Sequence, residues 1–373
     1  MRRARAHAFL PLLPLLAVLA ACASQFGPNS IRAERPNYNR EISASQDEQM
    51  LSNLVRLRYQ DTPLFMELTS VVTTYTFDRS LGLGAKLHPG EGNDEVSPSL
   101  GLLLGNRPTI TYLPLQGEEF AQRMLSPMPL GSILFFAQTG WSVDRLLLLC
   151  VQRINDVFNA PTATGPTPPA PPDHERFLLL TAQLRRLAEN SLFGMNWEHV
   201  AGETMPPGQK PVFWLRAPSD AASPLHADLQ AVRSALALEA GRDQFQLTQF
   251  PFHRAPDEIG MRGRSLLGLL YFLSQSVEAP DEHIAAGLVT VTRHADGRPF
   301  DWRTMLGSTM RIRSASSRPA SAYVAVWHRG ACFYIDDTDH ASKASLNLLH
   351  FLFSLQSASG KGRSPVLTLP VGG

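Results

Sequence analysis

The sequence predicts an α+β protein in which antiparallel sheet elements pack with helices, in one or two subdomains. Three observations support this class. Apolar residues recur at helical spacing in several segments, β-branched residues and tyrosine partly alternate between residues 64 and 113, and short strand patterns return after residue 300. Because helix patterns and strand patterns occur in separate runs, segregated layers are expected rather than a parallel α/β sheet.

Residues 1–21 are expected to form a lipoprotein signal peptide that ends before Cys22. Three arginines within the first five residues precede an apolar stretch, which ends in Leu19-Ala20-Ala21-Cys22 and matches a lipobox. The stretch 8–21 has 14 residues and two prolines, whereas a membrane-spanning helix needs about 20 apolar residues. Cleavage as an ordinary secretory signal is the alternative.

A lipobox implies that Cys22 carries a diacylglyceryl thioether and an amine acylated by a fatty acid such as palmitate. Several acyl chains, at roughly 0.8 kcal/mol per buried CH₂, anchor a protein stably, whereas one chain is marginal. Residue 23 is alanine and not aspartate, which favours the outer membrane, with the body of the protein in the periplasm. Residues 22–40 include Gly27-Pro28-Asn29-Ser30 and are expected to form a flexible tether.

The composition describes a globular body with little net charge. Removal of 21 residues from 373 leaves 352, enough for one large or two ordinary domains. Three of the 34 Lys and Arg residues belong to the signal, so the mature chain contains 31 basic and 33 acidic residues. This balance argues against nucleic acid as a partner. The expected partners are the membrane, through the lipid, and an envelope protein; no cofactor is implied.

Residues 41–160 are predicted to contain a helix, a β-meander and further helices. The first helix covers 45–59 and begins at the capping box Ser45-x-x-Glu48. Strands are predicted over 64–77, 81–87, 99–104 and 108–113, and helices over 118–125, 131–139 and 142–158. Glycines at 82, 84, 101 and 105 favour a mobile flap, with close approach by another backbone as the alternative.

Residues 161–172 contain six prolines and are expected to form a linker or a long exposed loop before the C-terminal α+β domain, 173–373. In that domain, helices are predicted over 175–192, 224–238, 265–277 and 341–356, and strands over 212–215, 245–250, 309–313 and 366–369. Strands over 322–327 and 331–335 are joined through His328-Arg329-Gly330 in a tight hairpin.

An acidic cluster lies between the last hairpin and the helix that follows it, and consists of Asp336, Asp337, Asp339 and His340. Its oxygen atoms and imidazole could hold a metal or act in acid/base hydrolysis. The favoured interpretation is that the aspartates cap the following helix. The spacing fits neither an EF-hand nor a zinc helix, and the common hydrolase motifs do not occur in the chain, so no metal site is assigned.

Arginines form a second cluster in the C-terminal part of the chain. Arg311 and Arg313 fall on one face of a predicted strand, and Arg264 precedes an apolar helix. Such arginines can bind a carboxylate or a phosphate with bidentate geometry. Ion pairs with the acidic cluster are the favoured alternative.

Two cysteines, Cys150 and Cys332, remain after Cys22 is assigned to the lipid. Both lie in apolar segments, where free cysteine commonly packs as a small hydrophobic residue. A disulfide between them is compatible with an oxidising periplasm. Two lone cysteines provide no pattern in favour of the disulfide, so free buried thiols are expected.

Four segments resemble a family of proteobacterial and planctomycete lipoproteins for which no activity is known. These segments are NLVRLRYQDTP (53–63), RPTITYLPLQG (107–117), RSLLG with YFLSQ (264–275) and FYIDD (333–337). The resemblance implies an architecture and a location, and it assigns no catalytic residue. The chain is therefore expected to be a membrane-anchored envelope lipoprotein that acts as a binding or scaffolding component of the envelope. A periplasmic hydrolase that uses the acidic cluster is the alternative.

Overall fold

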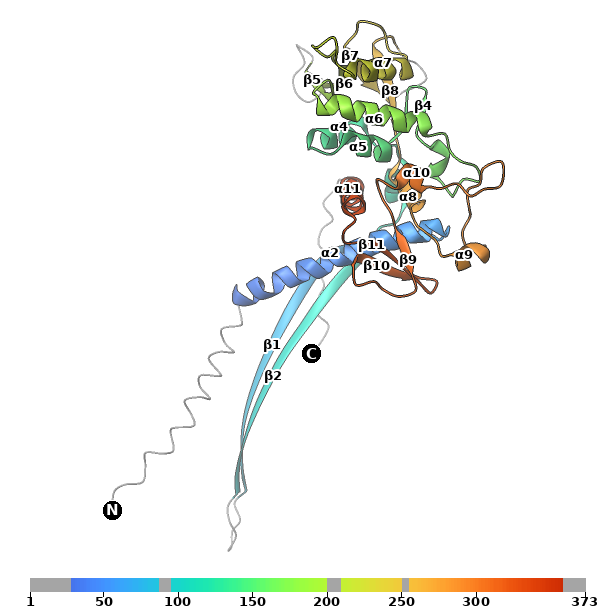
Figure 1. Ribbon diagram of the computed structural model, residues 1–373. Coiled ribbons are helices and arrows are strands. Elements are labelled where there is room, and N and C mark those ends of the chain that lie inside the picture. Colours follow the sequence, from blue (N-terminus) through green and yellow to red (C-terminus); the bar gives the residue numbers. More distant parts are fainter. Residues whose placement is uncertain (1–27, 87–94, 200–208, 250–254, 358–373) are drawn as a thin grey trace. The chain divides into compact units, whose positions relative to one another are not determined.

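The computed structural model describes residues 28–86, 95–199, 209–249 and 255–357, and it confirms the α+β class (Figure 1). The chain divides into two compact units. One consists of Leu64–Ala121, and the other combines the residues before Leu64 with those from Gln122 onward. The predicted strand over 366–369 lies outside the described residues.

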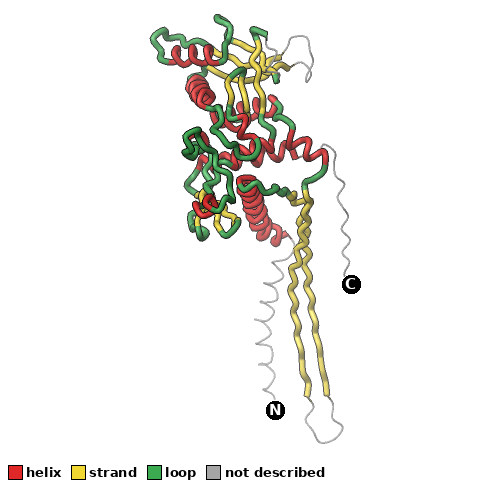
Figure 2. The backbone as a smooth tube through the Cα atoms, turned by 90° about the vertical axis from the view of Figure 1, so that its right-hand side faces the viewer, coloured by secondary structure: helices red, strands yellow, loops and turns green. Residues whose placement is uncertain are grey.

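The smaller unit is a long two-stranded antiparallel ribbon, drawn in yellow in Figure 2. Strands β1 (Met66–Lys86) and β2 (Glu95–Pro114) pair continuously from Met66 with Pro114 to Lys86 with Glu95, with one irregularity near Leu68. The prediction of four shorter strands is wrong, because the pairing continues through 78–80 and 105–107, which lie between the predicted strands. Part of the predicted flap, 87–94, lies outside the described residues.

Helix α2 (Pro28–Arg58) begins the larger unit. It starts 17 residues before the predicted boundary at 45, so Ser45 lies inside the helix and not at its cap. Residues 28–40 of the proposed 22–40 tether are therefore helical, although this segment contains Pro36 and three asparagines, which disfavour a helix. The C-terminal half of α2 is the buried part, with Leu51, Leu54 and Val55 each 0% exposed.

A six-stranded sheet has the order β4-β3-β8-β7-β6-β5. Its strands are β3 (Val151–Ile154), β4 (Val157–Phe158), β5 (Phe193–His199), β6 (Gln209–Leu215), β7 (Gln244–Thr248) and β8 (Glu258–Gly263). All neighbours are antiparallel except β7 and β8. Helices α4 (Leu130–Gln138) and α6 (Glu175–Glu189) pack against the sheet, and α6 also contacts α5 (Val143–Cys150) and α7 (Leu225–Ala235).

The predicted helix over 142–158 is wrong in its second half. Helix α5 ends at Cys150, and β3 and β4 follow as a small hairpin. Asn155 makes the turn with φ of 48°, a left-handed conformation that asparagine tolerates better than most residues. The β-branched residues Val151, Ile154 and Val157 suit strands, and they are fully buried there.

The proline-rich segment does not separate two domains, since both sides of it belong to the larger unit. It opens with a short 3-10 helix, η1 (Pro161–Thr164), and it is packed into the fold. The Thr292 hydroxyl donates to the carbonyl of Pro168 over 2.7 Å, and the amide of Arg293 donates to the carbonyl of Pro169 over 3.0 Å. Prolines keep their carbonyl acceptors, which explains how a proline-rich loop can be bound so closely.

A second group of elements surrounds the C-terminal half of α2. It contains a three-stranded sheet with the order β10-β11-β9, formed by β9 (Arg313–Ala315), β10 (Ala322–His328) and β11 (Ala331–Asp336). Helices α8 (Leu266–Ser274) and α11 (His340–Ser357) contact α2 and each other. The predicted 322–335 hairpin is confirmed, and Arg329 and Gly330 turn it with φ of 49° and 84°.

The remaining short helices are α3 (Glu118–Leu125), α9 (Asp281–Ala285) and α10 (Arg303–Leu306). Helix α3 has the predicted bounds. The sequence did not predict α9, α10, β5 or β8. Cys150 and Cys332 are free and buried, and burial raises the pKa of the Cys150 thiol to about 12.

Candidate binding pocket

The side chains of the acidic cluster are engaged in separate structural contacts. Asp336 accepts hydrogen bonds from the hydroxyls of Thr338 (2.6 Å) and Ser321 (2.8 Å), which hold its pKa at about 2. Asp337 pairs with Lys343 over 2.6 Å. Asp339 caps α11, because its carboxylate accepts from the amide (3.0 Å) and the hydroxyl (2.6 Å) of Ser342.

These contacts leave no convergent catalytic group at the cluster. His340 is exposed, and its ring has no hydrogen bond or ion pair with any residue that the structure describes. Across the same residues, no group of three or more histidine, cysteine or acidic side chains is arranged to hold a metal. The capping interpretation accounts for Asp339, and the hydrolase alternative loses the site on which it depended.

The cap role of Asp339 predicts a moderate loss of stability. Asp339→Ala should lower the free energy of unfolding by about 1 kcal/mol, as is typical when a helix loses its cap. Urea denaturation measures this change. Asp337→Ala is the matched control and should cost less, because Asp337 is exposed and such surface pairs contribute roughly 0–1 kcal/mol. Equal losses in the two variants would contradict the capping role.

Arg264 is buried inside the fold and does not line the pocket that is described below. Its side chain is 1% exposed, donates to the carbonyls of Asn159 and Ala160, and lies 4.0 Å from the centre of the Phe272 ring. Burial lowers its pKa to about 9, which leaves the group cationic at neutral pH. The prediction of a ligand-binding role for Arg264 is wrong, because the side chain ties the 159–160 turn to α8.

Arg311 and Arg313 both form ion pairs; Arg313 pairs with the acidic cluster, as the alternative interpretation expected, whereas Arg311 pairs with an acid outside it. Arg311 makes a bidentate pair with Glu278, with N–O distances of 2.7 and 3.3 Å, and these hydrogen bonds raise the pKa of Arg311. Arg313 lies 4.0 Å from a carboxylate oxygen of Asp336. The structure does not bring these two residues together with Arg264 in one site.

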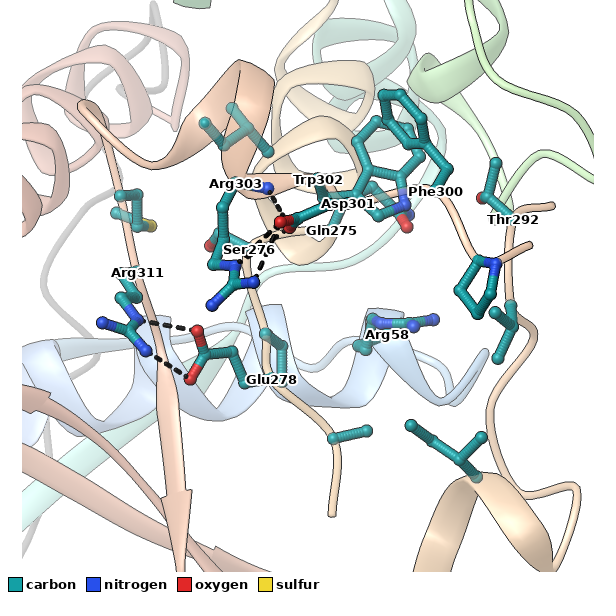
Figure 3. Close-up of a pocket in the computed structure, with 17 residues that line it drawn as sticks. Arg58, Gln275, Ser276, Glu278, Thr292, Phe300, Asp301, Trp302, Arg303 and Arg311 are labelled. Atoms are coloured by element: carbon teal, nitrogen blue, oxygen red, sulfur yellow. Dashed lines mark hydrogen bonds and ion pairs between the residues drawn. The ribbon is translucent and has the colours of Figure 1, made fainter. Parts of the chain in front are cut away.

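A pocket of about 340 Å³ lies beside Arg311, between the end of α2 and the segments that follow α8 (Figure 3). Its wall consists of Arg58 from α2, residues 275–279, Ile284 from α9, residues 291–292 and 299–303, and Leu306 from α10 with Met310 and Arg311. The volume falls in the lower part of the range of small-molecule sites, about 300–1,000 Å³. The pocket therefore has the size for a small organic molecule.

Local sequence fixes each wall of the pocket. Helix α8 ends at Ser274, and the hydroxyls of Ser274 and Ser276 donate to the carbonyls of Tyr271 and Leu273 in its last turn, both over 2.7 Å. The strand-like segment that follows is held beside Ile312, since Glu278 N donates to Ile312 O (2.8 Å) and Ile312 N donates to Ser276 O (3.1 Å). On the opposite wall, Asp301 orders the start of α10 by accepting a hydrogen bond from Arg303 N over 3.0 Å.

The end of α2 holds the loop that forms another wall. Arg58 donates to the Thr290 carbonyl over 2.8 Å, and the Gln60 side-chain amide donates to the Thr290 hydroxyl over 2.9 Å. Tyr59 shares a hydrogen bond of 2.6 Å with His283 Nδ1 at the start of α9. Arg58 also donates to the Thr167 hydroxyl (3.3 Å), which links it to the proline-rich segment.

The charges that line the pocket do not balance. Arg311 pairs with Glu278, and Arg303 pairs with Asp301 through two N–O distances of 2.9 Å. Arg58 is 7% exposed, and no carboxylate in the described part of the chain lies within ion-pair distance of it. In Figure 3, dashed lines join the first two pairs, whereas none reaches Arg58. Desolvation by burial lowers the pKa of Arg58.

Three buried polar atoms of pocket residues have no hydrogen-bond partner in the described structure: Arg58 Nε, Gln275 Oε1 and Trp302 Nε1. Their side chains are 7%, 3% and 8% exposed. Unsatisfied buried polar groups are uncommon in native proteins, because each costs about 1–3 kcal/mol. Three of the six such atoms in the described part of the chain belong to residues of this pocket, so the unmet hydrogen-bonding capacity is concentrated there.

Sequence reasoning missed all three of these residues. The sequence does contain a signal for Arg58. The spacing of one helix face connects Leu51, Leu54, Val55 and Arg58, so a charged residue lies on an otherwise apolar face. Gln275 follows the apolar run of α8, and Trp302 stands in a stretch without regular periodicity. Their convergence comes from the tertiary fold.

Comparison of the chain with protein-family models, with curated proteins and with solved structures found no match. The resemblance to a lipoprotein family therefore stays an expectation. Among the helices of the described ranges, none has both the length and the apolar character needed to cross a bilayer.

Proposed function

We propose that this chain is a lipid-anchored envelope protein whose body binds a small ligand in the pocket between the end of α2 and residues 275–311. The observation that carries the proposal is the set of unsatisfied polar atoms on Arg58, Gln275 and Trp302 around one pocket. A bound molecule would supply the missing partners. The dispersed contacts of the acidic cluster favour binding over hydrolysis.

The anchor half of the proposal rests on the sequence. Cys22 and the signal peptide lie outside the described residues, and the lipobox supports acylation of Cys22 as the attachment to the outer membrane. The body would then work in the periplasm, close to the membrane surface. The first described element after the lipid site, α2, ends at Arg58 in the pocket wall.

A scaffolding role is the second candidate, and the β1–β2 ribbon favours it. The two strands form a sheet of their own, without a third strand from the described residues, and Val72, Ile110 and Tyr112 are 55%, 47% and 50% exposed. Isolated two-stranded ribbons are marginally stable in water, and their free edges readily pair with other strands. A protein that only scaffolds has no need of a ligand in the pocket.

A variant that fills the pocket tests the proposal. A ligand that binds the folded state stabilises it by RT ln(1 + [L]/Kd), about 2.7 kcal/mol at a concentration 100 times Kd. We expect a thermal-unfolding screen of small molecules to find ligands that raise the Tm of the full-length protein. The same ligands should leave the Tm of Ala279→Trp unchanged, because Ala279 lines the pocket and the indole would occupy it.

The matched control is Ala285→Trp, which introduces the same side chain at an exposed position of α9 that does not line the pocket. It should respond to ligands as the unmodified protein does. Ligands that stabilise Ala279→Trp equally would place binding elsewhere. A screen without any stabilising ligand would favour the scaffolding candidate.

A further inference from the structure

We propose that the ligand of this pocket is a small organic monocarboxylate with an apolar or aromatic body. The inference rests on the proposed function and names the chemical class that the pocket recognises. The feature behind it is a pocket lined by paired charges and apolar side chains, with one buried arginine left without a carboxylate.

The charge of the pocket sets the charge of the ligand. Three arginines and two carboxylates line it, and each carboxylate is already held by its own arginine. The remaining positive charge belongs to Arg58. A buried cation without a counterion is costly, and a single carboxylate offsets that cost with charge-assisted hydrogen bonds. A neutral ligand leaves the charge uncompensated, and a dianion brings one charge too many.

The free hydrogen-bonding atoms have the complementary chemistry. Arg58 Nε and Trp302 Nε1 are both donors, and a carboxylate offers two acceptor oxygens. Gln275 has its amide nitrogen engaged with Thr167 over 3.2 Å, so its carbonyl oxygen remains as an acceptor for an N–H or O–H on the same ligand. All three atoms are closed to solvent, and a ligand reaches them only as the surrounding side chains shift.

The walls near Arg58 favour an apolar or aromatic body. Phe300 and Trp302 meet edge to face, with ring centres 5.1 Å apart and planes at 88°. Ile284, Val291, Leu306 and Met310 add aliphatic surface to the same pocket. A ring or short chain attached to the carboxylate would bury its apolar area there, at about 25 cal/mol per Å². Inorganic phosphate has no group that could use these walls.

Three probes of one shape but different charge test the inference. They are phenylacetate, phenylacetamide and 2-phenylethylammonium, each titrated calorimetrically into the full-length protein purified in detergent. We expect phenylacetate to bind at least tenfold more tightly than phenylacetamide, and 2-phenylethylammonium to bind least. Arg58→Met should weaken phenylacetate at least tenfold while it changes the affinity for phenylacetamide by less than about threefold, because the charge alone separates these two probes.

Arg298→Met is the control, since Arg298 is exposed, is paired with Asp296 and does not line the pocket. It should change phenylacetate affinity by less than about threefold. Arg58→Lys keeps the charge if Arg58→Met fails to fold, and it should retain the preference for phenylacetate over phenylacetamide. Equal affinity for the two probes in the unmodified protein would overturn the carboxylate inference while leaving a ligand-binding pocket. Failure of all three probes would also overturn it, and the screen with Ala279→Trp would then decide the proposed function separately.

Discussion

Replacement of Cys22 by serine is expected to abolish lipid attachment completely. The thioether requires the cysteine sulfur, so Cys22→Ser should incorporate no labelled palmitate, whereas the unmodified protein should be labelled. Several acyl chains, at roughly 0.8 kcal/mol per CH₂, make dissociation from the membrane negligible, and their loss should change the partition between membrane and solution by orders of magnitude. Metabolic labelling and membrane fractionation measure the two effects.

Two controls isolate the role of Cys22. Cys150→Ser should keep the label, because Cys150 is a buried thiol inside the fold. Since an uncleaved apolar signal could hold the serine variant on the membrane, partition is measured with residues 1–22 replaced by an ordinary cleavable signal. That protein should be found in the soluble periplasmic fraction. Palmitate labelling of Cys22→Ser, or continued membrane binding after the replacement, would contradict the anchor.

The largest loss of stability among these predictions is expected for Asn159→Ala. Asn159 is 0% exposed, and its amide nitrogen donates to the carbonyls of Leu148 (2.8 Å) and Val151 (2.6 Å), where α5 ends and β3 begins. Alanine would leave both carbonyls buried without these bonds, at about 1–3 kcal/mol each, and would add a small cavity. The free energy of unfolding should fall by roughly 2–5 kcal/mol in urea denaturation.

Asn190→Ala is the matched control for this effect. The Asn190 side chain also donates to a backbone carbonyl near the end of a helix, that of Arg186 at 2.8 Å, but at an exposed position where water can replace it. Its loss should change stability by less than about 0.5 kcal/mol. Similar losses of stability for the two variants would mean that the hydrogen bonds of Asn159 do not stabilise the junction between α5 and β3.

The sequence predicts the amphipathic helices and the last hairpin well, because local spacing and turn residues determine them. The patterns of α3, α6 and the β10–β11 hairpin hold in the structure. The sequence fails where tertiary contacts override local signals. The predicted 142–158 helix becomes α5 and a small hairpin because β3 pairs with β8, more than 100 residues away. The proline-rich segment is packed by contacts from residues 292 and 293.

The candidate pocket was harder to predict than the fold. Its polar residues stand at positions 58, 275 and 302, so only the folded chain brings them together. The acidic cluster was conspicuous because its residues are adjacent in sequence, yet adjacency at a strand-to-helix junction mainly serves capping. An isolated arginine on the apolar face of a helix was the more informative signal.

Native mass spectrometry tests most directly whether the pocket beside Arg58 holds a small molecule. The full-length protein and Ala279→Trp are extracted from their own membranes in mild detergent and compared. We expect the unmodified protein to carry a small noncovalent mass that collisional activation releases, and Ala279→Trp to carry none. The same released mass from both proteins, or no released mass from either, would contradict a ligand in this pocket.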